Sequence, residues 1–206
     1  LNTTVDMPGD YELTLINLIN GCETTQSITV NQDLDLPIAI AGDDEILTCD
    51  VDFIQLDATN SSSGNPYSNV WLNLNGDTLD ENTLTPNIEF PDIYILTIYN
   101  NVSECQMSDT IIVSQDLNAP NVEIEVADTL TCDNLSFNLD GSNSDSGNDY
   151  QISWETQNGN ILSGQNTLTP EINEAGTYIL TILNTTNNCE TSQQVTVNQD
   201  TIHPIA

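Results

Sequence analysis

The feature that most constrains the fold of this chain is an internal repeat of 83–84 residues. Its clearest marker is a cysteine that recurs at Cys22, Cys105 and Cys189, at intervals of 83 and 84 residues. Self-similarity at a fixed period of this size is typical of tandem structural units, each of which folds in the same way. The same intervals separate four other sets of matching residues: Cys49 and Cys132; Trp71 and Trp154; Tyr11, Tyr94 and Tyr178; and Pro37, Pro120 and Pro204.

The recurring prolines mark the predicted boundaries between repeats. The sequence predicts the C-terminal part of one repeat at 1–36, complete repeats at 37–119 and 120–203, and the start of another at 204–206. Because the chain starts and stops in mid-pattern, we expect it to be a window on a longer protein. The linkers are only about three residues long, so neighbouring repeats should touch rather than swing freely.

Each repeat has the pattern of an all-β domain. Apolar residues alternate with others at 94–98 and at 178–182, which indicates strands with one buried face. Clusters of turn-forming residues separate such runs, at 60–66 in one repeat and at 141–149 in the next. About seven short strands in a repeat of this length predict an immunoglobulin-like β-sandwich, arranged head to tail along the chain.

The spacing within 37–119 also allows individual strands to be assigned. We expect two short strands within 37–49, a strand at 54–56, and a central strand that contains Trp71. The tryptophan is expected to pack in the core rather than to form a ligand platform. Residues 91–94 resemble a tyrosine corner, which marks the start of a later strand.

Several short segments resemble a known family of repeats. They are Pro-Ile-Ala-Ile-Ala-Gly-Asp at 37–43, Leu-Thr-Cys at 47–49, Gln-Leu-Asp at 55–57, Trp71, Tyr-Ile-Leu-Thr at 94–97, Asn-Gly-Cys at 20–22 and Val-Asn-Gln-Asp at 30–33. The set resembles the PKD-like, immunoglobulin-like tandem repeats of giant secreted surface proteins of the Bacteroidota, which include gliding-motility adhesins and other type IX secretion cargo. The resemblance covers essentially the whole chain and implies an extracellular location. These repeats mostly serve as spacers, and a fold alone does not dictate a function.

Composition excludes several partners. The chain has 32 aspartates and glutamates, no lysine or arginine, and a formal net charge of −32. Without cationic side chains it has nothing to neutralise nucleic-acid phosphates, and anionic membrane surfaces would repel it. No apolar run approaches the roughly 18 residues that a membrane span needs. The expected partners are neighbouring repeats of the same chain and other copies in a filament.

Five cysteines at repeat positions predict a disulfide framework rather than a zinc site. One bridge per repeat would join Cys49 to Cys105, and Cys132 to Cys189. The strand assignment places Cys49 and Cys105 at opposite ends of a sandwich, about 23 Å apart, whereas a disulfide needs Cα atoms within about 7 Å. We therefore favour a bridge between repeats, Cys49–Cys189, with the partners of Cys22, Cys105 and Cys132 outside this window. One bridge per repeat stays the alternative.

Acidic residues cluster at the predicted joints between repeats. Calcium takes six to eight oxygen ligands, so carboxylates brought together at a joint would bind it and stiffen the array. The other interpretation is a solvated acidic face suited to saline water, since no EF-hand spacing is present. The candidate ligands are Asp33, Asp35, Asp43 and Asp44 at one joint and Asp116 and Asp128 at the next.

Four threonines follow an aspartate and precede an aliphatic residue, a pattern that resembles the O-glycosylation sequon of the Bacteroidota. They are Thr78, Thr110, Thr129 and Thr201. Thr110 and Thr129 are explained equally well as strand residues.

The sequence therefore favours a structural stalk or fibre segment of a large bacterial surface adhesin or extracellular filament. The alternative is a carbohydrate- or protein-binding module that acts through the loops 61–67 and 142–150, with Tyr67 and Tyr150 as contact residues. We do not expect an enzyme, because an active site would break the repeat symmetry and nothing in the sequence does so.

Overall fold

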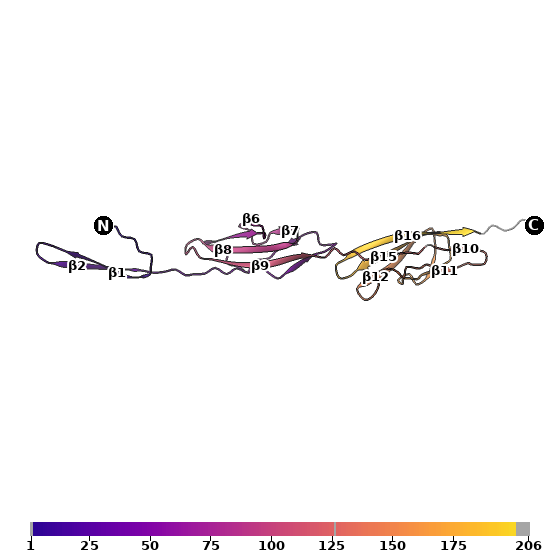
Figure 1. Ribbon diagram of the computed structural model, residues 1–206, viewed down its shortest axis with the longest axis horizontal. Coiled ribbons are helices and arrows are strands. Elements are labelled where there is room, and N and C mark those ends of the chain that lie inside the picture. The colour runs from indigo at the N-terminus through magenta and orange to yellow at the C-terminus, as the bar shows by residue number, and fades with distance from the viewer. Residues whose placement is uncertain (1, 126, 201–206) are drawn as a thin grey trace, which may run out of the picture. The chain divides into compact units, whose positions relative to one another are not determined.

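The computed structural model describes residues 2–125 and 127–200, which form β-strands and loops without any helix (Figure 1). Thr201 and the predicted start of a repeat at 204–206 therefore lie outside the described residues. Within the described part of the chain, nothing helical is long and apolar enough to cross a membrane. The chain divides into two compact units, Leu1–Gly42 with Leu56–Pro86 and Tyr94–Thr110, and Asp43–Gln55 with Asn87–Ile93 and Ile111–Ala206.

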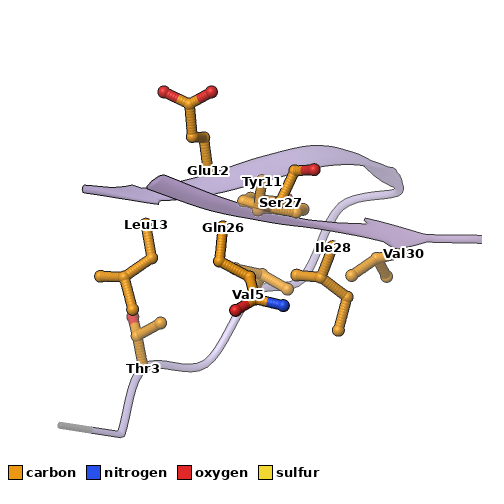
Figure 2. A pocket seen from close by; sticks show the side chains of 9 residues that line it. All are labelled: Thr3, Val5, Tyr11, Glu12, Leu13, Gln26, Ser27, Ile28 and Val30. Carbon is orange, nitrogen blue, oxygen red and sulfur yellow. The ribbon is translucent and has the colours of Figure 1, made fainter. Parts of the chain in front are cut away.

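The first strands form a two-stranded sheet, a hairpin of β1 (Gly9–Ile16) and β2 (Glu23–Val30), antiparallel from Gly9 opposite Val30 to Ile16 opposite Glu23. Apolar residues alternate along both strands, so one face of the hairpin is apolar. Figure 2 shows Leu13, Ile28 and Val30 on the side of the hairpin where Val5 lies.

The next seven strands form two sheets. The larger has the order β3-β9-β8-β5-β6, in which β3 is parallel to β9 and β5 is antiparallel to β8, and the smaller pairs β4 with β7. These strands are β3 (Glu45–Leu47), β4 (Ile54–Gln55), β5 (Tyr67–Leu72), β6 (Thr78–Glu81), β7 (Asn87–Ile88), β8 (Asp92–Asn100) and β9 (Gln106–Gln115).

The last seven strands form a second pair of sheets, with the orders β10-β16-β15-β12 and β11-β14-β13. One apolar core lies within them, built around Trp154, Tyr178, Leu180, Ile172 and Leu139, all at most 1% exposed. The strands are β10 (Thr129–Thr131), β11 (Phe137–Asn138), β12 (Tyr150–Gln157), β13 (Ile161–Ser163), β14 (Glu171–Ile172), β15 (Gly176–Asn184) and β16 (Cys189–Asp200).

The predicted fold class is confirmed: the chain is all-β and immunoglobulin-like. The structure also forms a tyrosine corner, in which the hydroxyl of Tyr178 donates to the carbonyl of Glu174 at 2.6 Å. Tyr11 makes the same bond to the carbonyl of Met7 at 2.7 Å. The two tryptophans are fully buried, as core packing requires.

The expectation of two strands within 37–49 is wrong in part. Only Glu45–Leu47 is a ladder strand, and residues 37–44 are held by side chains instead. The backbone N–H of Ile40 donates to the Ser61 hydroxyl, and that of Ala41 donates to the Asp109 carboxylate, each at 2.8 Å. Side-chain acceptors therefore replace the strand neighbour that the apolar pattern predicted.

Candidate functional site

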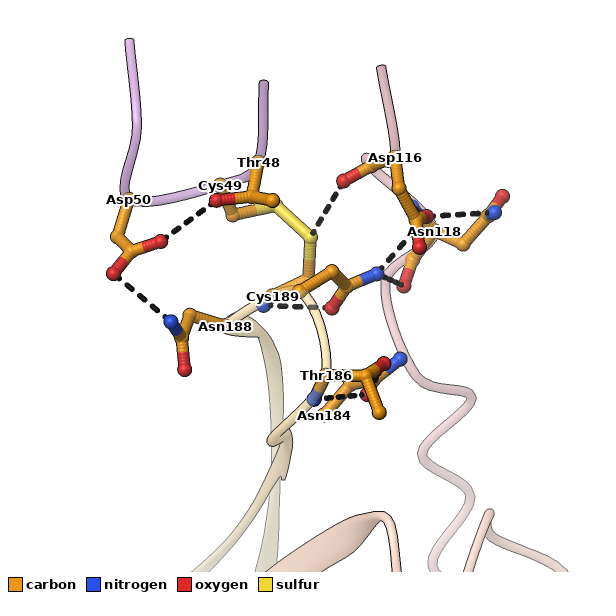
Figure 3. Close-up of a disulfide and its surroundings, with 10 residues drawn as sticks. Thr48, Cys49, Asp50, Asp116, Asn118, Asn184, Thr186, Asn188 and Cys189 are labelled. Atoms are coloured by element: carbon orange, nitrogen blue, oxygen red, sulfur yellow. Dashed lines mark hydrogen bonds between the residues drawn. A yellow bond between two sulfur atoms is a disulfide. The ribbon is translucent and has the colours of Figure 1, made fainter. Parts of the chain in front are cut away.

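The feature that stands out from the repeats is a disulfide between Cys49 and Cys189, which are 140 residues apart in sequence (Figure 3). Cys49 lies in the turn that follows β3, and Cys189 is the first residue of β16. Their Cα atoms are 5.0 Å apart, within the range for this bond. The structure thus contains the pairing that the strand assignment favoured, and it leaves Cys105 without a disulfide partner.

The turn between β15 and β16 presents Cys189 to its partner. Asn184, which ends β15, pairs with Cys189 across the turn. The Asn184 side chain accepts the Thr186 N–H at 3.0 Å, and Asn188 takes a left-handed backbone conformation with φ 55°. Asparagine tolerates that conformation better than most residues, so the sequence favours this tight reversal.

Asn187 is the centre of the polar contacts around the disulfide. It is 1% exposed. Its amide nitrogen donates to the Asp116 carboxylate at 3.0 Å and to the Asn118 carbonyl at 3.1 Å, and its amide oxygen accepts the Cys189 N–H at 3.0 Å. Its own carbonyl accepts the N–H of Cys49 at 3.2 Å. The buried side chain therefore ties residues 116–118 to the turn that holds Cys189, and the Asn187 backbone ties the same turn to Cys49.

A carboxylate also lies on each side of the disulfide. Asp50 accepts the Thr48 hydroxyl at 2.8 Å and the Asn188 amide at 3.0 Å, and these bonds hold the pKa of Asp50 below its ordinary value of 3.8. The pKa of Asp116 is also lowered, first by the backbone N–H of Asn118 and then by the Asn187 side chain. Both groups are stabilised in their charged form by donors that carry no charge.

Sequence reasoning missed Asn187, although the repeat contained a signal for it. The residue two positions before each recurring cysteine is polar, and in all three copies its side chain accepts that cysteine's N–H. The acceptor–donor pairs are Asn20 with Cys22 at 3.1 Å, Ser103 with Cys105 at 3.4 Å, and Asn187 with Cys189 at 3.0 Å. A position that keeps this bond while its residue type changes serves the geometry of the turn.

The linker at 33–36 makes a related set of contacts. Ser103 and Asn100 donate to the carbonyl of Asp35 at 3.1 and 3.2 Å, and Asp33 accepts the N–H of Asp35 at 3.0 Å. Asp35 is therefore the counterpart of Asn118, and Ser103 that of Asn187. The nearby Cys105 is half-buried and free, while Cys22 and Cys132 are exposed and free.

The structure does not bring the six predicted calcium ligands together. The described residues contain no group of three or more His, Cys, Asp or Glu side chains close enough to hold a metal ion. Several of the six act singly as acceptors for the backbone instead: Asp33 for Asp35, Asp44 for Ile112, Asp116 for Asn118 and Asp128 for Thr129. Asp43 is exposed.

Three of the four candidate glycosylation sites can be placed. Thr78 is exposed at the start of β6, Thr110 is exposed in β9, and Thr129 is half-buried in β10, where it pairs with Asn198 of β16. The accessible hydroxyls at 78 and 110 remain candidates, while Thr129 has the strand role that its β-branched side chain also predicts.

The two predicted binding loops use their polar groups internally. Ser61 and Ser144 are buried, and each exchanges hydrogen bonds with the backbone of one residue, Ile40 and Glu123 respectively. The Tyr67 hydroxyl donates to the Asp35 carboxylate at 3.3 Å. These three groups hold the loops in place through contacts within the chain.

No family model and no curated protein matches the chain. Solved structures of tandem domains resemble it at low identity. The three N-terminal domains of the outer capsid protein Hoc of bacteriophage RB49 are 10% identical, with a TM-score of 0.46, over 94% of this chain and 79% of that one. Titin domains I67–I69 are 12% identical, with a TM-score of 0.44, over 80% of this chain and only 66% of that one. Extracellular domains 3–5 of Drosophila OTK are 14% identical, with a TM-score of 0.39, over 94% of this chain and 71% of that one. The strand pairing described above therefore carries the argument for the fold.

Proposed function

We propose that this chain is a structural segment of a large secreted bacterial surface adhesin or extracellular filament, in which disulfides and short linkers stiffen a row of immunoglobulin-like repeats. The observation that carries the proposal is the Cys49–Cys189 disulfide. With repeat boundaries at 36/37 and 119/120, Cys49 belongs to one repeat and Cys189 to the next. A bond of this kind constrains two neighbours without serving any single active site.

The repeat pattern extends the proposal to the other cysteines. Cys105 and Cys22 are counterparts of Cys189, and Cys132 is the counterpart of Cys49. In a longer array Cys105 and Cys22 would each pair with the cysteine at the Cys49 position of the preceding repeat, and Cys132 with the cysteine at the Cys189 position of the following repeat. Every joint would then carry one bridge. Residues 1–36 would then be the last strands of a repeat that is otherwise built like β3–β9.

Disulfide chemistry and charge support a location outside the cell. Disulfides persist in oxidising environments and are rare in the cytosol. A chain without lysine or arginine offers trypsin-like proteases no cleavage site, and its uniform negative charge suits a surface in saline water. The segments at 37–43, 47–49 and 94–97 resemble the PKD-like repeats of secreted Bacteroidota surface proteins, and we propose the chain as one of them.

The buried polar residues support a structural role over a catalytic one. Among the described residues, each of the five that are buried makes hydrogen bonds within the chain: Ser61, Thr97, Asn100, Ser144 and Asn187. Catalytic groups are more often left partly unsatisfied, with perturbed pKa values in a cleft.

Peptide mapping without reduction tests this proposal directly. The native protein is cleaved with Glu-C and chymotrypsin, and we expect a crosslinked peptide that contains Cys49 and Cys189. A peptide that joins Cys49 to Cys105 would contradict the proposal, because it would make each repeat self-contained. The same spectra would show hexose-type additions on Thr78, Thr110, Thr129 or Thr201 if the sequons are used.

The double variant Cys49→Ser with Cys189→Ser measures what the bond contributes. Closing a loop of 140 residues should stabilise the folded state by about 2–5 kcal/mol. We expect thermal unfolding of the double variant at a clearly lower temperature. The control Cys105→Ser removes a free thiol at the matching position and should leave the unfolding temperature unchanged.

A further inference from the structure

The hairpin β1–β2 exposes the face that its counterparts bury. Leu13, Leu15 and Ile28 are 54%, 52% and 67% exposed. The counterparts of Leu13 and Leu15 in β15, Leu180 and Ile182, are fully buried, and the counterpart of Ile28 in β9, Ile111, is 1% exposed. The sequence pattern of this face is therefore that of a core surface, and it has no cover among the described residues of the hairpin.

The other two hairpins show which strand lies beside the one that corresponds to β1. In β8 the counterpart of Leu13 is Leu96, which lies opposite Trp71 of β5. In β15 it is Leu180, which lies opposite Trp154 of β12. In both cases an antiparallel strand that contains a tryptophan is hydrogen-bonded to the strand that contains Tyr94 or Tyr178.

A groove of about 940 Å³ runs along the exposed face of β1–β2, between the hairpin and residues 3–5 (Figure 2). Val5 lines it at the position that corresponds to the buried residues Ile88 and Ile172. Val5 thus takes the place that a residue of β7 or β14 takes in the other strand sets. β1 itself pairs only with β2 among the described strands. What the groove lacks is the strand on the outer side of β1.

We propose that β1 accepts an antiparallel β-strand with a central tryptophan, of the type of β5 and β12, and that this tryptophan lies opposite Leu13. Main-chain hydrogen bonds to the free edge of β1 would supply part of the affinity, and burial of the indole against Leu13, Leu15 and Ile28 the rest. The inference rests on the repeat architecture proposed above, and it names the strand and the register that complete the first repeat.

A synthetic peptide of residues 66–73, which carries β5, tests the proposal against the isotopically labelled chain. We expect saturable NMR shifts along β1 and a nuclear Overhauser contact between the peptide indole and the Leu13 methyl groups. Replacing the peptide's tryptophan by alanine should weaken binding at least about tenfold, since the indole is the largest apolar group buried.

Two variants of the chain distinguish a loss of the apolar face from a loss of the hairpin. Leu13→Asp should weaken binding at least about tenfold, whereas Thr14→Asp, on the opposite face, should leave it unchanged. The Gly9–Val30 pairing, read from cross-strand contacts, shows whether each variant keeps the hairpin. Absence of shifts at about 1 mM peptide, binding in another register, or self-pairing of β1 between two copies would each overturn the proposal. None of these results would alter the Cys49–Cys189 peptide map, so failure here is distinct from failure of the proposed function.

Discussion

The strand sets β3–β9 and β10–β16 follow one sequence pattern, yet they place their fourth strand in different sheets. In the first set β6 pairs with β5, where Val70 lies opposite Glu81. In the second set β13 pairs with β14, where Ile161 lies opposite Ile172. Two copies of one repeat can therefore have matching core residues and still differ in how a connecting segment completes the sheets.

A close approach of two glycines, Gly159 and Gly176, is found in the second set only, since a Cβ added to Gly76, the counterpart of Gly159, would meet nothing within 4 Å. A Cβ added to Gly176 would lie 2.7 Å from the backbone nitrogen of Gly159 and 2.8 Å from its Cα. This close approach lets the segment after β12 cross the start of β15, where the Tyr178 hydroxyl accepts the N–H of Asn160 at 3.1 Å. The residue at the position of Gly176 in the first set is Asp92, whose side chain would occupy that space.

The two tryptophans differ in the hydrogen bonding of their indole N–H groups. The indole N–H of Trp154 donates to the carbonyl of Thr167 at 2.9 Å, and Gln165 binds the Trp154 backbone from the same segment. The indole N–H of Trp71 is buried with no hydrogen-bond partner among the described residues. The route of the following segment, rather than the strand that holds the tryptophan, decides whether its donor is satisfied.

The largest expected effect comes from exchanging the residues at the crossing. Gly176→Asp should destabilise the β10–β16 domain by about 3 kcal/mol or more, because the new side chain meets backbone atoms that cannot rotate away. The reciprocal change, Asp92→Gly, should cost less than about 1 kcal/mol. Hydrogen exchange of the β15 and β8 amides measures each. Equal losses at the two positions would contradict the role given to the glycine pair.

The next effect compares the two polar residues that precede a cysteine. Asn187→Ala removes the buried side-chain amide that bonds to Asp116, Asn118 and Cys189, and it should cost about 2 kcal/mol. The backbone carbonyl that accepts the Cys49 N–H is kept. Ser103→Ala, at the half-buried counterpart, should cost about 0.5–1 kcal/mol. Thermal unfolding of the oxidised protein compares them, and a larger loss at Ser103 would show that the disulfide makes the Asn187 bonds redundant.

A smaller effect separates the tryptophans. Trp154→Phe leaves the Thr167 carbonyl without its donor, whereas Trp71→Phe removes a donor that was already unsatisfied. Both variants lose the same part of the ring, so Trp154→Phe should lower the free energy of unfolding by about 1 kcal/mol more than Trp71→Phe does. Denaturant unfolding followed by residue-resolved NMR gives the two values. If the two losses match, water or another group satisfies Trp71 in solution.

The smallest effect is a pH dependence near the disulfide. The folded-state pKa of Asp116 lies below its ordinary value of 3.8, so its charged form stabilises the fold above that pH. This stability is lost as the pH falls below 3.8 through the folded-state pKa. The difference in unfolding temperature between the native chain and Asp116→Asn should therefore shrink between about pH 6 and about pH 2.5. A constant difference would mean that the lowered pKa contributes nothing.

Sequence reasoning reached the features that depend on periodicity. The spacing of Tyr94 and Tyr178, the burial of Trp71 and the approach of Cys49 to Cys189 all follow from strand alternation and end-to-end geometry. It failed where one contact selects between two backbone routes, as at Gly159 and Gly176. Gly159 recurs as Gly76 whereas the position of Gly176 holds Asp92, and spacing along the chain does not reveal the close approach of the two glycines. It also grouped the acidic residues by position along the chain, although carboxylates such as Asp44 serve individual backbone donors in separate places.

The Cys49–Cys189 bond also divides the polypeptide into a part that transmits tension and a closed loop that does not. A pull applied at the two ends of the chain passes from Cys49 to Cys189 through two sulfur atoms, and the intervening residues bear none of the covalent load. That loop corresponds to a sequence separation of 140 residues, which is roughly 460–500 Å of extended chain at about 3.3–3.6 Å per residue. Reduction of one bond would release this contour length, so oxidation state sets how far the molecule stretches before its backbone is taut.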